Sequence, residues 1–258
     1  MDLKDITVVI TTFKSEHKIF SCINSIPNNV RIIIVENSSD ENFKKKVESS
    51  YSNVECFLSG ENKGYSVANN YGLSKVTTRY GLVLNPDTKL DKDTIKDFLS
   101  TASAYPDFWL IGPAQDSKET VKANEIIEVK DLKGFALFFN MKKFMKTFFD
   151  ENFFLYFEEI DLCKKIKINR GKIFLNNKII VHHDGSLSVN QIYKDELDKN
   201  RNWHWMWSTF YFHKKYKGFF LALIIVSPKL LSSIFRIIFY FLTFNKKLKD
   251  IYYYRLSG

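Results

Sequence analysis

Short apolar runs alternate with amphipathic segments along most of the chain, and the alternation predicts strands and helices in turn. Runs of about four to eight residues rich in Val and Ile predict buried strands, and apolar positions three and four apart predict helices. Strands are expected at 6–12, 30–35, 54–58, 80–84, 108–111, 134–140, 172–175 and 178–182. Helices are expected at 15–25, 41–50, 65–75 and 92–104, and from Glu158 to a stop at 169–171.

The strand–helix unit repeats four times before residue 90 and then becomes irregular, with a polar stretch at 114–131. Short apolar strands that alternate with helices form parallel sheets with right-handed crossovers. The pattern therefore predicts an α/β fold with a mostly parallel, Rossmann-like central sheet flanked by helices.

The run at 80–84 ends at Asn85-Pro86-Asp87. Pro86 cannot donate to a sheet ladder, so Asp87 lies just past the carboxyl end of an expected central strand. Ligands of open α/β sheets bind at this edge, where a carboxylate can hold a divalent cation and the cation a diphosphate. The same residues also suit an ordinary turn that caps the next helix.

Two more expected strands end in short polar side chains, at Thr11-Thr12-Phe13 and at Glu36-Asn37-Ser38. Such side chains can bind a nucleoside by directional hydrogen bonds, or they can cap the helices that follow. No glycine-rich phosphate loop follows the first strand, which disfavours dinucleotide dehydrogenases and P-loop NTPases.

An aromatic run is followed by three acids at an expected helix start. Asp161 precedes two lysines by one turn and is expected in an exposed ion pair. Glu158 and Glu159 precede Leu162 and Cys163 by one turn, so they are expected above the buried side. A carboxylate directed at a site beside aromatic walls suits a general base, and acids at a helix start also suit the helix dipole.

His182 and His183 end the last expected strand of this region. A neutral imidazole is a common metal ligand, but one core histidine with a solvated neighbour fits equally. The three cysteines have no metal-type spacing, which favours a reducing compartment. The start of the chain runs directly into a strand, so no secretory signal is expected.

The net charge of +9 lies entirely in residues 201–258, which hold ten Lys and Arg and one acid. These basic residues are interleaved with Phe, Leu, Ile and Tyr, a pattern that favours an anionic membrane surface over nucleic acid. The region therefore differs in character from residues 1–190, and we expect a catalytic domain at 1–190 and a helical tail at 191–258.

Within this tail, a helix is expected over 190–217, and an apolar stretch over 219–244 carries Pro228, Lys229 and Arg236. A single spanning helix would bury two cations and a kink, at a cost of several kcal/mol. Interfacial or re-entrant helices are therefore favoured over two alternatives, a packed subdomain or homo-oligomer contact and a true span.

Six segments in this order resemble the inverting GT-A glycosyltransferases of family 2, and within it the bacterial rhamnosyltransferase-like enzymes. The resemblance covers about residues 5–190. Its segments are Val9–Phe13, Ile34–Asp40, Asn62–Asn70, Leu84–Thr88, Phe149–Leu162 and His182–Ser188.

The resemblance implies roles for matching positions. Asp87 stands at the last aspartate of the family's metal motif, and Asn85 replaces the first. Glu159 matches the catalytic base, here one methylene longer, next to Glu158. One of His182 and His183 matches a histidine that helps to hold Mn²⁺ or Mg²⁺, with His182 favoured. The residues implied in nucleotide-sugar binding are Thr11, Thr12, Phe13, Glu36, Asn37, Asn62, Gly64, Asn70 and Asn85.

The implied function is transfer of a sugar, with dTDP-rhamnose as the candidate donor, from a nucleotide-diphosphate sugar to a lipid-linked glycan acceptor. The implied place is the cytoplasmic face of a bacterial plasma membrane, in lipopolysaccharide or other polysaccharide assembly. Two alternatives stay open. One is a sugar nucleotidyltransferase, although Thr11 to Ser15 lack the glycine-rich phosphate loop of such enzymes. The other is a non-catalytic, membrane-bound sugar-binding relative.

Overall fold

The computed structural model describes residues 2–114, 125–145, 148–183 and 194–258. The expected continuation of the last motif, at 184–188, and the start of the expected helix at 190 lie outside the described residues. The chain divides into two compact units. The first comprises Met1–Glu151 and Glu159–Asn190, and the second comprises Asn152–Glu158 and Gln191–Gly258.

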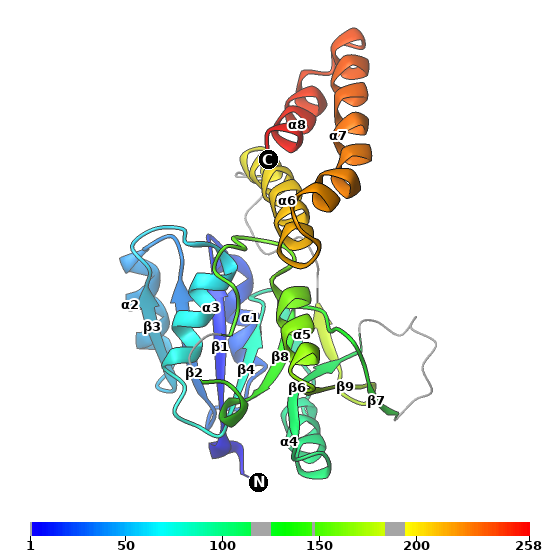
Figure 1. The fold of residues 1–258 in the computed structure, drawn as a ribbon. Coiled ribbons are helices and arrows are strands. Elements are labelled where there is room, and N and C mark those ends of the chain that lie inside the picture. The colour runs from blue at the N-terminus through cyan, green and yellow to red at the C-terminus, as the bar shows by residue number, and fades with distance from the viewer. Residues whose placement is uncertain (1, 115–124, 146–147, 184–193) are drawn as a thin grey trace. The chain divides into compact units, whose positions relative to one another are not determined.

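The first unit is built on an eight-stranded sheet in the order β3-β2-β1-β4-β8-β6-β9-β7 (Figure 1). Strands β3, β2, β1 and β4 are parallel, β8 runs against both β4 and β6, β9 is parallel to β6, and β7 is antiparallel to β9. A separate antiparallel pair joins β5 to β10. The strands are β1 Ile6–Thr12, β2 Arg31–Glu36, β3 Val54–Leu58, β4 Tyr80–Leu84, β5 Thr88–Leu90, β6 Phe108–Pro113, β7 Ile126–Glu128, β8 Ala136–Asn140, β9 Lys172–Asn176 and β10 Val181–His183.

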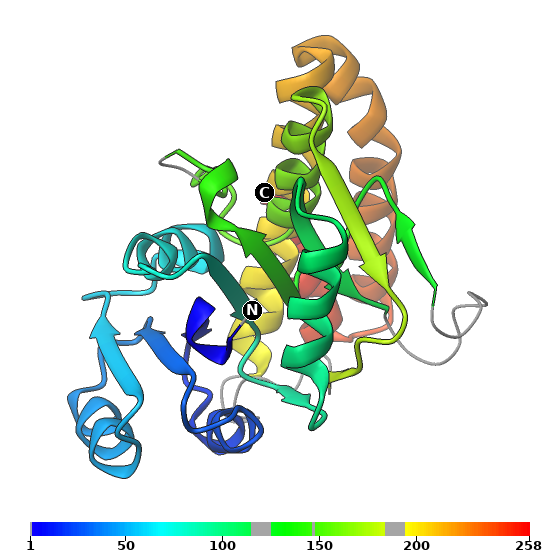
Figure 2. The same ribbon diagram turned by 90° about the horizontal axis from the view of Figure 1, so that it is seen from below.

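Helices cover both faces of this sheet (Figure 2). Buried side chains of α1, α2 and α4 join one core cluster, and those of α3 and α5 join the other. The predicted α/β fold with a mostly parallel central sheet is thus confirmed. The helices are α1 Glu16–Asn24, α2 Glu41–Ser50, α3 Gly64–Ser74, α4 Thr94–Ala104 and α5 Glu158–Ile168, with short 3₁₀ turns at Leu3–Asp5 and Met141–Lys143.

Two packing features fix helices on the sheet. Tyr80, Phe98, Phe108 and Phe138 are fully buried, and each ring lies 5.0–5.8 Å from another of the four. Aromatic pairs of this kind contribute about 0.5–1.5 kcal/mol each beyond their buried area. On the other face, a Cβ at Gly72 would lie 2.5 Å from Val9 Cγ1, so α3 approaches β1 as closely as it does only because residue 72 is glycine.

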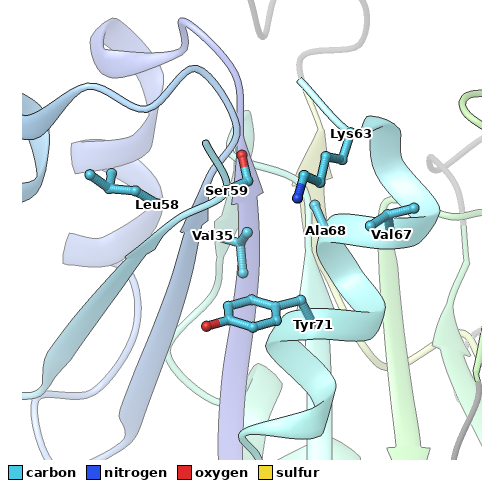
Figure 3. Close-up of a pocket in the computed structure, with 7 residues that line it drawn as sticks. All are labelled: Val35, Leu58, Ser59, Lys63, Val67, Ala68 and Tyr71. Atoms are coloured by element: carbon cyan, nitrogen blue, oxygen red, sulfur yellow. The ribbon is translucent and has the colours of Figure 1, made fainter. Parts of the chain in front are cut away.

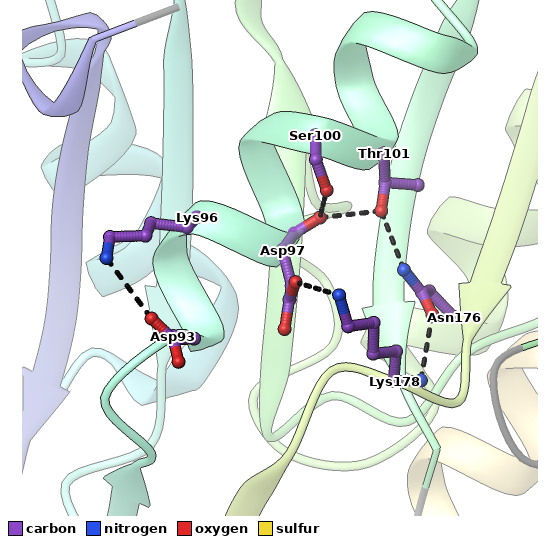
Figure 4. A network of polar contacts seen from close by, with 7 residues as sticks. All are labelled: Asp93, Lys96, Asp97, Ser100, Thr101, Asn176 and Lys178. Atoms are coloured by element: carbon purple, nitrogen blue, oxygen red, sulfur yellow. Dashed lines mark hydrogen bonds and ion pairs between the residues drawn. The ribbon is translucent and has the colours of Figure 1, made fainter.

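A polar network ties α4 to the chain that leads into β10 (Figure 4). Asn176 Nδ2 donates to Thr101 Oγ1 at 2.7 Å, and Asn176 Oδ1 accepts from the Lys178 backbone N–H at 2.8 Å. Lys178 Nζ lies 3.1 Å from Asp97 Oδ1. These contacts position the turn after β9 and therefore the strand that carries His182 and His183.

The short strands differ from the prediction. β5 and β7 have three residues each and were not predicted, because so short a run shows no alternation. The strand predicted at 178–182 begins at Val181 and pairs with β5 outside the main sheet. Its partner follows Pro86, and no local pattern in the sequence reveals that pairing.

In the second unit, three helices pack against one another (Figure 1). They are α6 Lys194–Lys217, α7 Phe219–Leu242 and α8 Lys246–Ser257. α7 continues through Pro228, contrary to the predicted interruption. Proline supplies no N–H for the Ile224 carbonyl, and the Ser227 hydroxyl donates to that carbonyl at 2.9 Å instead. Within the described residues, only α7 is long and apolar enough to cross a bilayer, judged by length and composition.

Candidate active site

The polar strand ends of the first unit meet at one edge of the sheet. In the strand register Thr12 lies beside Glu36, Glu36 beside Leu58, and Ile10 beside Leu84. The loops after β1, β2, β3 and β4 therefore leave the sheet at the same edge, as expected for an open α/β fold.

Asp87 and His183 meet beyond the end of β4. The Asp87 side chain is almost fully buried, and its Oδ1 lies 3.4 Å from His183 Nε2. Pairing of β5 with β10 sets this contact by placing His183 beside Thr88. The Phe135 ring stacks on the His183 ring at 4.8 Å and an interplanar angle of 9°. Asn85 Nδ2 lies 3.5 Å from the same imidazole nitrogen, so Asn85 belongs to this cluster.

His182 points to a different partner. Its Nε2 lies 2.9 Å from Asp91 Oδ1, and both side chains are about half exposed. Successive residues of a strand face opposite sides, so only one of the two histidines can face Asp87. The structure brings His183, rather than the favoured His182, to that carboxylate.

The Asp87 cluster suits a divalent cation. Asp87 Oδ1 is buried and accepts no hydrogen bond from the described residues, which is costly unless a ligand completes it. A carboxylate oxygen and an imidazole nitrogen are ligands that Mn²⁺ accepts, whereas Mg²⁺ prefers oxygen. No group of three or more His, Cys, Asp or Glu that could hold a metal occurs within the described residues. Among the described residues, Asp87 and His183 are thus the two candidate ligands of this cluster.

Glu159 stands in the first turn of α5 and is partly exposed. Burial raises the pKa of its carboxyl group, and the nearby backbone N–H groups and Lys133 oppose that rise. A Cβ placed on Gly134 would lie 3.5 Å from Glu159 Cγ and 3.6 Å from its carboxyl carbon. The Tyr65 hydroxyl donates to the Gly134 carbonyl at 2.8 Å and holds this segment. A carboxyl group with a raised pKa and access to solvent suits a general base.

Two consecutive residues, Gly134 and Phe135, connect the two carboxylates. Gly134 lies against Glu159, and Phe135 stacks on the histidine that meets Asp87. The Asn85 N–H donates to the Phe135 carbonyl at 3.0 Å, which joins this segment to the end of β4. Since neighbouring Cα atoms are about 3.8 Å apart, Glu159 and the Asp87 cluster lie against adjacent residues of one segment.

The residues implied in nucleoside binding form a connected pair of loops. Both carboxylate oxygens of Glu36 accept hydrogen bonds within its own loop, from Ser38 and from the Asp40 N–H. Asn37 Nδ2 donates to Asn62 Oδ1 at 3.0 Å and to the Gly64 carbonyl at 3.2 Å. Glu36 and Asn37 therefore stabilise the loops at this edge of the sheet. These contacts leave fewer side-chain groups for direct contact with a nucleoside than the sequence suggests.

Asn70 has a similar positioning role. Its side chain donates to the Phe149 carbonyl at 2.9 Å and to Glu151 Oε1 at 3.0 Å, and it accepts from the Phe149 N–H at 2.9 Å. Asn70 therefore fixes residues 149–151. At the end of β1, the Thr11 hydroxyl is buried and has no partner among the described residues, Thr12 is buried, and Phe13 is partly exposed. The Thr11 hydroxyl and the Phe13 ring remain available to a ligand.

Asp161 does not form the predicted exposed ion pair, because it is completely buried. The prediction rested on its one-turn spacing from two lysines. Asp161 also lies three positions after Glu158 and directly precedes Leu162, both of which are buried. It thus belongs to the inner stripe of α5, where packing outweighs a weak helical ion pair.

A pocket of about 200 Å³ lies between the ends of β2 and β3 and helix α3 (Figure 3). Lys63 and Ser59 stand at its loop end and Tyr71 at the other, and the remaining lining is apolar. Ligand pockets usually measure about 300–1,000 Å³. At about 200 Å³ this pocket is smaller than a usual ligand pocket.

Cys22 Sγ lies 3.8 Å from the Asn85 carbonyl oxygen, but the cysteines are unsuited to nucleophilic chemistry at this site. Burial raises the pKa of the Cys22, Cys56 and Cys163 thiols to about 12, so each is protonated at neutral pH and is a poor nucleophile. Among the residues that sequence reasoning missed, Gly134, Phe135 and Tyr65 act through contacts with distant segments. No local signal marks them.

Comparison with known proteins decides the family. The model of glycosyl transferase family 2 matches residues 7–176, which include all of β1 except Ile6, the Asp87 turn and Glu159. The chain belongs to glycosyl transferase family 2. A relative of this family 2 chain is the low-salt glycan biosynthesis hexosyltransferase Agl10 of Haloferax volcanii, 26% identical over 202 residues. That match covers 66% of this chain and 65% of the relative, just under two thirds of its length.

Two solved structures share the fold of this family 2 chain. Mannosyltransferase PcManGT from Pyrobaculum calidifontis, in complex with GDP-Man and Mn²⁺, has a TM-score of 0.62 and 12% identity, over 98% of this chain and 85% of that one. TarS from S. aureus has a TM-score of 0.55 and 16% identity, over 76% of this chain and 39% of that one. The GT-A-like fold expected from the sequence is therefore confirmed.

Proposed function

We propose that the chain is an inverting, metal-dependent hexosyltransferase that moves a sugar from a nucleotide-diphosphate donor to a glycan acceptor. The Gly134–Phe135 segment supports this proposal most directly. It links Glu159, whose pKa is raised, to the Asp87–His183 pair. Family membership, the hexosyltransferase relative and the fold shared with a GDP-Man complex support it.

Glu159 accepts the proton of the acceptor hydroxyl as that oxygen attacks the anomeric carbon. Burial raises its pKa, which makes the carboxylate a stronger base than an exposed glutamate. Attack from the side opposite the leaving nucleotide inverts the anomeric centre, and no covalent intermediate with the enzyme is needed.

Asp87 and His183 hold the divalent cation, which supplies electrostatic stabilisation of the departing diphosphate when bound. Thr11 and Phe13 contact the nucleoside, while Glu36, Asn37, Asn62, Gly64 and Asn70 hold the loops that shape its site. Glu158 follows the aromatic run and precedes the base, and it fixes the start of α5.

We further propose rhamnose as the sugar and a lipid-linked glycan as the acceptor, in bacterial cell-surface polysaccharide assembly. Residues 1–190 carry the catalytic site, and residues 191–258 hold the enzyme at the cytoplasmic face of the plasma membrane. The concentration of the excess positive charge in residues 201–258 supports that division. Each Lys or Arg near an anionic surface contributes about 1 kcal/mol to binding.

The donor assignment can be tested by thermal unfolding with a panel of nucleotide sugars. A ligand that binds only the folded state raises the midpoint, so one donor is expected to stabilise the chain, and more so with Mn²⁺ than with EDTA. A nucleotidyltransferase would instead respond to a sugar phosphate together with a nucleoside triphosphate. That response, with no effect of any nucleotide sugar, would overturn the proposed function.

A further inference from the structure

Helix α7 carries its polar residues on the side that packs against other helices and its apolar residues on the exposed side. A helix of a water-soluble bundle has the reverse arrangement. The inner stripe of α7 repeats at spacings of three and four residues and packs against α6 and α8. The stripe begins with the buried residues Ala222 and Val226 and continues with polar residues. Those polar residues are Lys229, the buried Ser233, Arg236 and Tyr240.

The outer face of α7 is apolar and exposed. Six of its side chains, Phe220, Ile224, Leu231, Phe235, Phe241 and Leu242, are between 65% and 80% exposed. A soluble monomer rarely leaves so continuous an apolar face in water, whereas hydrocarbon is the natural environment for it. Both cations of α7 lie on the other side, so they do not obstruct contact of this face with a bilayer.

Lys229 and Arg236 each share an aromatic ring of a neighbouring helix with a third cation, Arg255. Lys229 Nζ and Arg255 Cζ lie 4.7 and 4.9 Å from the centre of the Trp205 ring. Arg236 Cζ and Arg255 Cζ lie 5.0 and 5.2 Å from the centre of the Tyr252 ring. The charges that share a ring are thus no farther apart than about 10 Å, which is close to the Debye length of about 8 Å at physiological salt.

No acid lies within ion-pair distance of these three cations in the described part of the chain, although other basic residues of this unit have such partners. Lys199 and Lys247, for example, pair with Asp250 and Asp195. Aromatic contacts attract each cation but leave its positive charge uncompensated. Arg236 is exposed and uses one N–H on the Tyr252 hydroxyl, so its other donors are available at the surface.

We propose that Lys229, Arg236 and Arg255 attract the phosphate groups of anionic phospholipids at the surface of a bilayer whose acyl chains contact the outer face of α7. Three cations without an acid attract an anion, and guanidinium groups match the geometry of phosphate oxygens. The apolar face on the opposite side of α7 favours phosphates that carry hydrocarbon over free phosphate. This inference deepens the membrane placement proposed above, and its test needs no enzyme activity.

The test measures binding of the full chain to phosphatidylcholine vesicles that contain phosphatidic acid. The cluster variant is K229Q/R236Q/R255Q. The matched control, K214Q/K217Q/K246Q, removes three exposed charges of the same unit that make no ion pair or ring contact among the described residues. We expect the cluster variant to lose at least about tenfold more affinity than the control. Equal losses in the two variants would show that diffuse charge attracts the membrane and would overturn the site.

A second measurement uses the unmodified chain, so that it holds even if the triple variant folds poorly. Vesicles made equally negative with oleic acid in place of phosphatidic acid carry their excess negative charge on carboxylates and not on phosphate. The site predicts tighter binding to phosphatidic acid at matched surface potential, and equal binding contradicts it. Inorganic phosphate at millimolar concentration should not release the chain from phosphatidic acid vesicles; release would assign the cluster to free phosphate.

Discussion

Replacing Glu159 with glutamine is expected to lower turnover by about 10²- to 10⁴-fold, the usual contribution of a general base, and to leave donor affinity unchanged. Glutamine keeps the size of the side chain and its acceptor oxygen for the backbone N–H groups, but it cannot take a proton. Initial rates of sugar transfer and donor titration by calorimetry measure the two effects separately.

The same substitution has an expected signature in stability. A carboxyl group whose folded-state pKa is raised stabilises the fold below its unfolded pKa, and that stability is lost as the pH rises through the folded pKa. E159Q should therefore be at least as stable as the wild type at neutral pH, and its stability should vary less with pH. A clear loss of stability would indicate a structural role for Glu159.

Asp131→Asn is the matched control for this experiment. Asp131 raises the pKa of Glu159 by its negative charge, and it is exposed. Its neutralisation should retain turnover and shift the acid limb of the pH–rate profile to lower pH. If D131N loses as much activity as E159Q, the base is not Glu159 alone.

Replacing Asp87 with alanine is expected to lower transfer by about 10³-fold or more, because a bound cation supplies several kcal/mol of charge stabilisation in the transition state. The variant should also lose any Mn²⁺-dependent rise in the unfolding midpoint with donor present. Its fold should persist, since Asp87 Oδ1 makes no hydrogen bond in the described structure that alanine would remove.

The two histidines provide an internal comparison. His183→Ala should lose most of the metal effect, because His183 Nε2 faces Asp87. His182→Ala removes only an exposed contact with Asp91 and should retain it. If His182→Ala instead loses the metal effect and His183→Ala retains it, His182 is the metal ligand. Full activity of Asp87→Ala would show that no catalytic metal binds at Asp87.

The sequence predicted the elements whose signal is local. The strands at 6–12, 54–58 and 80–84 have the predicted bounds, because short apolar runs between turns have few alternatives. Pro86 placed Asp87 correctly, since proline ends a ladder wherever it occurs. The resemblance to family 2 rests on the order of six motifs along the chain, which no single segment reveals.

Features that depend on distant partners could not be predicted in this way. His183 faces Asp87 because β10 pairs with the three-residue strand β5, and β5 has no sequence pattern of its own. Asp161 has the spacing of a surface ion pair, yet the packing of α5 on the sheet buries it. The cations of α7 argued against a single spanning helix, and only the structure shows that they lie against Trp205 and Tyr252.

The central claim is that this edge of the sheet performs inverting sugar transfer, and the configuration of the product tests it most directly. The full chain would be incubated with Mn²⁺, the donor found by thermal unfolding and a lipid-linked acceptor. NMR of the product then gives the anomeric configuration of the new bond. We expect transfer that EDTA abolishes, and a product whose anomeric configuration is opposite to that of the donor. Retention of configuration, or transfer that persists in both EDTA and the E159Q variant, would contradict it.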